Sequence, residues 1–439
     1  MKRDIYTKLS EWKASLQRKP LILQGARQVG KTYIIKAFAK DTYAETLYLN
    51  FEEDKRLQSL FQENLSASRI LRDIELLYHT KINPHTTLLI FDEIQECQPA
   101  LNSLKYFQEN EPDIHIIAAG SLVGVKLGQT RGFPVGKVNF LKLYPLNFFE
   151  FLSAINRSDL RDYLQNIMTS QPINEAIHAE LLKILKEYIF VGGMPAVINQ
   201  YRLNNYSYEL ARQEQLEIVH SYVLDFAKYA QPFDAIKISR VWNNIPEQLA
   251  KDNKKFIFSV IRRGARARDY EYSLQWLMDS GLIYPIENIS DVALPLSAHA
   301  NHEIFKIYLM DVGLLGAMCH LDPMVMLDGN ELFTSFKGSL IENYVLQEIK
   351  SHLDSPIYYW TSEGQAEVDF LLEHQQTVYP LEVKAGISKK KKSLRLFGGT
   401  YPQSPLSRCT AMNLAQDGGI LNYPLYLAAL FPQRGHGSV

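Results

Sequence analysis

The residues with the clearest chemistry lie between positions 25 and 33, where glycines, a lysine and a threonine have the spacing of a phosphate-binding loop. The segment follows the apolar residues 21–23 and reads Gly25-Ala26-Arg27-Gln28-Val29-Gly30-Lys31-Thr32-Tyr33. Glycines allow a tight turn in which several N–H groups point at one anion, and a helix that begins near Lys31 adds its positive end. Lys31 would reach the β- and γ-phosphates of a nucleotide, and Thr32 would offer its hydroxyl to Mg²⁺. The alternative is an ordinary glycine-containing turn from strand to helix.

An acidic pair, Asp92 and Glu93, ends the apolar run of residues 88–91. Such a run indicates a buried parallel strand, and α/β sheets bind ligands at the carboxyl ends of these strands. Asp92 would hold Mg²⁺ through its water shell. Glu93 points elsewhere because it is one residue further along, and it is the candidate to orient or deprotonate the attacking water. The glycine-rich loop and the acidic pair support each other as parts of one site.

Two later residues are candidates to complete that site. The run of residues 114–121 predicts a core strand that ends on Ser121, whose hydroxyl could sense the γ-phosphate or hold the attacking water beside Glu93. Alternatively, Ser121 only caps the segment that follows. Arg131 lies in the loop-rich residues 122–147 and could reach the nucleotide of a neighbouring subunit, since an inserted arginine is a recurrent means of stabilising charge. That role requires an oligomer.

The last third of the chain holds a second set, three carboxylates and a lysine: Glu342, Asp369, Glu382 and Lys384. Glu342 lies on an expected helix, and the other three lie on two strands, residues 367–372 and 379–384, that the sequence predicts as a hairpin. Because side chains alternate across a strand, Glu382 and Lys384 project from one face, and Asp369 can lie opposite them. Asp369 and Glu382, with a third carboxylate from the helix, can hold a divalent cation, and the lysine can activate a water for attack on a phosphodiester. Each charge taken alone is ordinary for an amphipathic strand.

Two basic segments are candidates for contacts with DNA phosphates. Between Lys254 and Arg268 there are six cations and no acid. A short helix from Ile245, a longer helix over residues 265–280 and a strand after it suggest a winged helix-turn-helix around this segment. Its arginines could equally contact the nucleotide or another domain. Between Lys389 and Arg395 there are five cations in seven residues, which a solvated helix start explains as well as DNA binding does.

These residues need several supporting domains. Strands alternating with helices over residues 1–150 predict an α/β fold with the parallel sheet of a P-loop NTPase. Helical spacing over residues 151–230 predicts a helical lid subdomain. We expect the winged helix over residues 231–300 and an α/β domain, which carries the second set of charges, over residues 301–439. The length of 439 residues leaves room for about three domains on the usual size range.

The composition is that of an ordinary globular protein, with 46% hydrophobic and 22% charged residues. The net charge of −1 gives no global field that would attract nucleic acid. The three cysteines, Cys97, Cys319 and Cys409, match no metal-binding spacing and suit a reducing compartment. No apolar run reaches the roughly 18 residues of a membrane span, and polar residues follow the first methionine. We therefore expect a cytoplasmic protein without a membrane segment.

The chain resembles the prokaryotic AAA-plus-type ATPases that join a P-loop ATPase and a winged-helix module to a C-terminal domain of uncharacterised function with a restriction-endonuclease-like core. The markers are Gly25 to Thr32, Ile90 to Gln95, Ala119-Gly120-Ser121, Val191-Gly192-Gly193-Met194-Pro195, Gly264 to Tyr270, and Glu367 to Phe370 with Glu382-Val383-Lys384. The resemblance implies ATP and Mg²⁺ at the first site. The last markers resemble the Asp…Glu-x-Lys signature, PD-(D/E)xK, of a superfamily whose members mostly cut DNA. A valine precedes Asp369 where proline is frequent, a change that the superfamily tolerates.

Two hypotheses of function are consistent with these features. The first is an ATPase whose hydrolysis rearranges the winged module and a Mg²⁺-dependent nuclease-like domain on DNA. The second is an ATP-dependent switch or binding module whose C-terminal domain is catalytically inactive and binds a protein partner.

Overall fold

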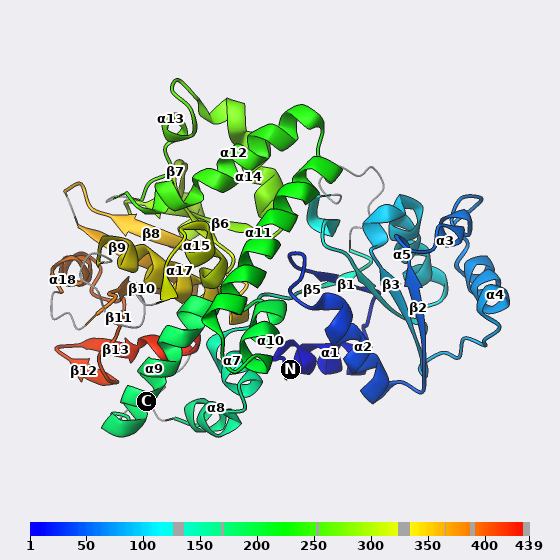
Figure 1. The fold of residues 1–439 in the computed structure, drawn as a ribbon, viewed down its shortest axis with the longest axis horizontal. Coiled ribbons are helices and arrows are strands. Elements are labelled where there is room, and N and C mark those ends of the chain that lie inside the picture. Colours follow the sequence, from blue (N-terminus) through cyan, green and yellow to red (C-terminus); the bar gives the residue numbers. More distant parts are fainter. Residues whose placement is uncertain are drawn as a thin grey trace. The chain divides into compact units, whose positions relative to one another are not determined.

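The computed structural model describes residues 1–125, 136–167, 171–251, 254–323, 334–364, 366–386 and 391–432. Contacts divide the chain into two compact units (Figure 1). The N-terminal unit comprises residues 2–144 and 279–281, and the C-terminal unit comprises residue 1 with residues 145–278 and 282–439. Arg131, Lys389 and Lys390 lie outside the described residues. In the part of the chain that the structure describes, no helix is both long and apolar enough to cross a bilayer.

The N-terminal unit is built on a five-stranded parallel sheet in the order β2-β3-β4-β1-β5. The strands are β1 (Leu21–Gln24), β2 (Glu45–Asn50), β3 (Thr87–Asp92), β4 (His115–Ala119) and β5 (Asn139–Lys142). Strand β3 is buried along its whole length, because a parallel strand with helices on both faces meets no solvent. The α/β parallel sheet predicted for this region is confirmed.

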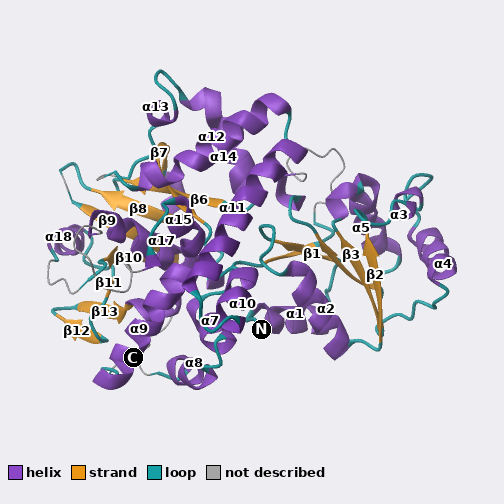
Figure 2. Ribbon diagram, viewed as in Figure 1, coloured by secondary structure: helices purple, strands orange, loops and turns teal. Residues whose placement is uncertain are grey.

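Helices cover both faces of this sheet (Figure 2). They are α1 (Ile5–Ala14), α2 (Lys31–Thr42), α3 (Arg56–Ser59), α4 (Ala67–Tyr78) and α5 (Gln98–Asn110), with a short 3-10 turn η1 (Ile94–Glu96). Leu89 and Phe91 of β3 belong to a buried cluster with Ile74 of α4 and Leu104 of α5. The residues between them project to the opposite face, since side chains alternate along a strand. Apolar side chains thus fill both faces, and the polar residues of β3 come at its carboxyl end.

The C-terminal unit contains a mixed eight-stranded sheet in the order β12-β13-β11-β10-β9-β8-β6-β7. Its strands are β6 (Ile283–Ile289), β7 (Asn301–Leu309), β8 (Ile357–Thr361), β9 (Glu367–His374), β10 (Thr377–Val383), β11 (Leu406–Thr410), β12 (Ala415–Asp417) and β13 (Ile420–Pro424). Strands β9 and β10 pair antiparallel, which confirms the predicted hairpin. Strand β6 pairs with β7 and with β8. A strand from the region expected to be a winged helix therefore belongs to the same sheet as the hairpin.

Three regions predicted from the sequence lie within this unit. The border expected at residue 300 lies between β6 and β7, which are hydrogen-bonded neighbours. By their contacts, residues 145–278 and 282–439 form one compact unit. The division into a helical lid, a winged helix and a C-terminal domain stays a prediction about sequence modules.

The helices of the C-terminal unit are α7 (Phe148–Ala154), α8 (Ser158–Gln165), α9 (Glu175–Val191), α10 (Pro195–Leu203), α11 (Tyr208–Tyr229), α12 (Pro232–Leu249), α13 (Phe258–Ile261), α14 (Ala267–Asp279), α15 (Val312–Met318), α17 (Thr334–His352) and α18 (Lys392–Thr400), with 3-10 segments η2 (Leu296–His299) and η4 (Leu425–Leu430).

Helix α12 is longer than the sequence suggests. The expected start at Ile245 is wrong, because Pro246 lies inside α12. Proline costs one hydrogen bond there, but buried Val241 and Trp242 on the preceding turns keep the helix packed.

The break between α9 and α10 depends on a close backbone approach. A Cβ atom on Gly193 would lie 2.1 Å from the carbonyl oxygen of Leu146, so no other residue fits without displacement. The N–H of Gly193 donates to the buried carboxylate of Asp311 at 2.6 Å, and Asp311 also accepts from the N–H of Leu314 at 2.9 Å, at the start of α15. The paired glycines of the sequence therefore mark a packing junction inside the unit.

Candidate functional site

The loop from β1 to α2 has the geometry of a phosphate-binding loop. Gly25 has φ of 149°, and a Cβ atom there would lie 2.3 Å from the carbonyl oxygen of Leu143. Gly30, with φ of 97°, is the N-cap of α2, so the helix starts at Lys31 as predicted. The backbone N–H groups of the first turn of a helix have no partner within the helix. The loop therefore directs N–H donors and a positive helix end to one place.

Lys31 is buried against this loop. Its ammonium donates to the carbonyl oxygens of Gly25 and Ala26, both at 2.8 Å. Burial lowers the pKa of Lys31 from 10.5 to about 8, although the nearby carboxylates of Glu93 and Asp92 act in the opposite direction. A buried cation with few competing solvent contacts is well suited to holding a phosphate.

The hydroxyl of Thr32 and the carboxylate of Asp92 are in direct contact. Thr32 Oγ1 donates to Asp92 Oδ2 at 2.8 Å, and the hydroxyl of Tyr48 donates to the same oxygen at 2.7 Å. Asp92 is buried at the end of β3, and Tyr48 lies on the neighbouring strand β2. Hydroxyl and carboxylate oxygens are the ligands that Mg²⁺ prefers, so the side chains of Thr32 and Asp92 fit that ion. The contact of Tyr48 joins residues distant in sequence and was not predicted.

Glu93 lies in the turn after β3, with φ of 49°. Burial raises the pKa of its carboxyl group, and a hydrogen bond from Gln95 Nε2 to Glu93 Oε2, at 2.5 Å, partly offsets the rise. The oxygen of the same Gln95 amide lies against Gly120, where a Cβ atom would be 1.9 Å from Gln95 Oε1. Gln95 therefore links Glu93 to the end of β4. Gln95 ends the segment Ile90 to Gln95 that carries the family resemblance, but the sequence alone predicted no role for it.

Ser121 is buried one residue beyond Gly120. Strands β3 and β4 are parallel neighbours, so Ser121 and Asp92 come at the same edge of the sheet. Its role toward the γ-phosphate or the attacking water stays a prediction. The role suggested for Arg131 falls on a residue outside the described ranges.

The hairpin of the C-terminal unit brings Asp369, Glu382 and Lys384 together. Lys384 Nζ lies 3.3 Å from Glu382 Oε1 and 3.9 Å from Asp369 Oδ2. Asp369 Oδ2 also accepts from the N–H of Val383 at 2.7 Å. Both carboxylates are buried. The sequence therefore identified three residues that the fold places within reach of one another.

The carboxylates of this cluster favour positive charge beside them, either on a bound cation or on protonated Lys384. Burial raises the pKa of Glu382, and its Oε2 is buried with no hydrogen-bond partner in the described part of the chain. Burial alone would lower the pKa of Lys384, but the carboxylates of Asp369, Glu382 and Glu342 raise it overall. Among the described residues, no group of three or more His, Cys, Asp or Glu side chains is arranged as a metal site. Glu382 Oε2 nevertheless leaves one ligand position for a cation beside Asp369.

Glu342 is held by other partners. Its Oε1 forms an ion pair with Lys254, and its Oε2 accepts from the hydroxyl of Tyr308 at 3.1 Å. Lys254 belongs to the segment that is a candidate for DNA contacts, but its side chain is largely buried and neutralises Glu342. A second ion pair joins the fully buried ammonium of Lys306 to the partly exposed carboxylate of Glu367. It lies close to the first, since the carboxylates of Glu342 and Asp369 also act to raise the pKa of Lys306. The sequence did not predict roles for Tyr308, Lys306 or Glu367, which reach the site from β7 and β9.

The remainder of the first basic segment differs from Lys254. Arg262, Arg263, Arg266 and Arg268 are all exposed. Arg268 lies 3.9 Å from Asp269, a weak surface contact. Contact of these four arginines with phosphate stays a prediction.

A family model described as an AAA domain matches residues 17–152. The match includes the phosphate-binding loop, the acidic pair and Ser121. Residues 17–152 form an AAA-type P-loop ATPase domain. The AAA domain coincides with the parallel sheet of the N-terminal unit, and its order of strands places both predicted motifs at one edge.

Two family models match the C-terminal unit. Both are described as domains of unknown function, DUF8612 over residues 182–325 and DUF4143 over residues 337–423. The first spans the borders that we expected at residues 230 and 300. The second contains Glu342 and the three residues of the hairpin cluster.

Relatives and solved structures add little on function. An uncharacterised protein of Methanocaldococcus jannaschii is 26% identical over 383 residues, which are 84% of this chain and 74% of that protein. The Walker-type ATPase of Pyrococcus abyssi has a TM-score of 0.44 and 16% identity, and the match covers 72% of this chain and 94% of that one. The ORC1 protein of Aeropyrum pernix, solved in complex with DNA, has a TM-score of 0.30 and 10% identity, covering 74% and 94% of the two chains. TM-scores below 0.5 carry no conclusion, so the AAA domain rests on the family match and the site geometry.

Proposed function

We propose that the AAA domain binds ATP with Mg²⁺ and hydrolyses it. The observation that carries this proposal is the direct contact of Thr32 with Asp92 beside the buried ammonium of Lys31. A bound Mg²⁺ would be held by Thr32 and Asp92, and it would neutralise charge on the β- and γ-phosphates.

The chain's own residues have separable tasks in this reaction. Lys31 is mostly protonated at neutral pH, because its pKa is about 8, and it binds the phosphates. Glu93 takes a proton from the attacking water, and its raised pKa suits a general base. Gln95 orients the carboxylate of Glu93 through its hydrogen bond. Ser121 sits at the same sheet edge and is proposed to contact the γ-phosphate or the water.

The test is a comparison of ATP binding and ATP hydrolysis in matched variants. Glu93→Gln should keep ATP affinity and lose hydrolysis by about 100-fold or more, the usual share of a general base. Lys31→Ala should lose ATP binding. Glu63→Gln and Lys40→Ala, both exposed residues of the same domain, serve as controls for the loss of one charge. ATP affinity in Lys31→Ala equal to that of the native protein would show that the site is wrongly assigned.

For the C-terminal unit we propose metal-dependent cleavage of DNA phosphodiesters. Support comes from the hairpin that gathers Asp369, Glu382 and Lys384, and from the unsatisfied buried oxygen of Glu382. Asp369 and Glu382 would hold Mg²⁺, which supplies charge stabilisation at the scissile phosphate. Lys384 keeps its proton and would orient the attacking water or stabilise developing charge. Exposed Arg262 and its three neighbouring arginines would contact the DNA backbone.

Cleavage of double-stranded, single-stranded and branched DNA, with Mg²⁺ or with EDTA, tests this second activity. Glu382→Ala should abolish cutting, whereas Glu363→Gln, an exposed acid of the same unit, should not. The competing function is an ATP-dependent switch whose C-terminal domain is inactive and binds a protein partner. Absence of metal-dependent cutting by the native protein, with ATP hydrolysis intact and indifferent to DNA, would favour that switch. The three cysteines are all free thiols, in line with the cytoplasmic location proposed for either function.

A further inference from the structure

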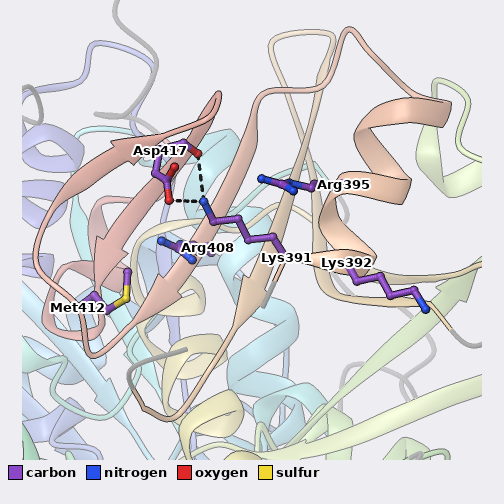
Figure 3. Close-up of a pocket in the computed structure, with 6 residues that line it drawn as sticks. All are labelled: Lys391, Lys392, Arg395, Arg408, Met412 and Asp417. Atoms are coloured by element: carbon purple, nitrogen blue, oxygen red, sulfur yellow. Dashed lines mark hydrogen bonds and ion pairs between the residues drawn. The ribbon is translucent and has the colours of Figure 1, made fainter. Parts of the chain in front are cut away.

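A cavity of about 650 Å³ in the C-terminal unit has a strongly basic lining. It is lined by Lys391, Lys392, Arg395, Arg408, Met412 and Asp417 (Figure 3). Four of these six side chains are cationic and one is acidic. The volume lies in the range of ligand-binding sites. We refer to it below as the basic cavity.

The positive charge of the basic cavity exceeds what its own acid can neutralise. Lys391 forms an ion pair with Asp417, and Figure 3 shows its side chain reaching that carboxylate. The pKa of Asp417 is lowered mainly by Lys391, with further contributions from Arg408 and Arg395. All three cations therefore lie close to one carboxylate. A lining of four cations and one acid favours the binding of an anion.

Arg408 connects the basic cavity to the cluster of Asp369, Glu382 and Lys384. Its side chain is only 2% exposed, and its backbone on β11 is the register partner of Glu382 on β10. Register partners on adjacent strands project to the same face of a sheet. The charge of Arg408 accordingly offsets part of the rise in the pKa of Glu382 that burial causes. A ligand in the cavity would thus lie beside Glu382.

We propose that the basic cavity binds the phosphates of a nucleic-acid strand, with Arg395 and Arg408 as the contacts. Arg408 forms the buried end of the site, and Arg395 and Lys392 are exposed at its mouth. The ammonium of Lys392 points away from Asp417 in Figure 3 and extends the positive charge outward. An opening of this kind admits a polymer that continues beyond the cavity. The proposal rests on the phosphodiester cleavage proposed above and names the surface that presents the substrate.

Binding is measured separately from cleavage. The full chain is titrated in EDTA against a fluorescein-labelled single-stranded oligonucleotide, and affinity is followed by anisotropy at several salt concentrations. Arg395→Ala should weaken binding about tenfold and reduce the salt slope by about 0.7, the change expected when one phosphate contact to a single strand is lost. Arg395→Lys should retain most of the affinity because it keeps the charge. Lys186→Ala, which removes an exposed cation elsewhere in the unit, should leave affinity unchanged.

Each outcome supports or overturns the proposal. Arg408→Gln should also weaken binding if its thermal unfolding matches that of the native protein. Arg395 is exposed, so Arg395→Ala keeps the test valid if the Arg408 variant fails to fold. Equal affinity of native protein and Arg395→Ala overturns the site. If inorganic phosphate at equal concentration displaces the oligonucleotide, the ligand is a small phosphate compound and the proposal of a nucleic-acid strand is overturned. Weakened binding in a protein that never cuts DNA supports the cavity and refutes the nuclease.

Discussion

The affinity of the AAA domain for ATP should fall as the pH rises from 7 to 9, and Lys31 should be the cause. Burial lowers the pKa of Lys31 to about 8. Its ammonium is then about 90% protonated at pH 7 and about 10% protonated at pH 9. Only the protonated form offers a full positive charge to the phosphates, so the apparent dissociation constant should rise about tenfold over this interval. Below pH 7 the contribution of Lys31 should be constant.

Titration with a fluorescent ATP analogue and Mg²⁺ at half-unit steps of pH measures this dependence. Lys31→Arg is the matched control, because a guanidinium stays protonated throughout the range. Its affinity should be independent of pH, whatever its absolute value. Lys40→Ala, a change at an exposed lysine of the same helix, should keep the native pH dependence. A native affinity that is flat from pH 7 to pH 9, in protein that remains folded, would refute the assigned burial and charge of Lys31.

Two further predictions concern contacts that the fold creates. Gln95→Ala removes the hydrogen bond that lowers the pKa of Glu93, so the acidic limb of the pH profile of ATP hydrolysis should move to higher pH while ATP affinity is kept. An acidic limb at the native pH would show that Gln95 does not tune the pKa of Glu93. Gly193→Ala places a methyl group 2.1 Å from the carbonyl oxygen of Leu146 and should lower the free energy of unfolding by about 2–3 kcal/mol. Gly399→Ala, where a Cβ atom meets nothing within 4 Å, is its control, and equal thermal midpoints for the two variants would contradict the close approach.

Local spacing was sufficient to predict which residues surround the loop between β1 and α2. The turn at Gly25, the helix that starts at Lys31 and the carboxylate of Asp92 at a strand end all depend on a few neighbouring residues. The hairpin that joins Asp369 with Glu382 and Lys384 is equally local, because a short turn fixes its register. In each case the side chains that meet are close in sequence, or lie at strand ends whose order a parallel sheet constrains.

The tertiary structure decided the partners of these groups. Tyr48 reaches Asp92 from another strand, Lys254 neutralises Glu342 instead of facing solvent, and Arg408 comes beside Glu382 by the order of strands in a sheet. None of these pairings has a signature in sequence spacing, because their members are far apart along the chain. Burial adds a second effect that the sequence does not contain: the pKa values of Lys31 and Glu93 depend on how much solvent the packed fold excludes. The sequence by itself determined which groups can do chemistry, and the packing of distant segments determined their neighbours and their charge.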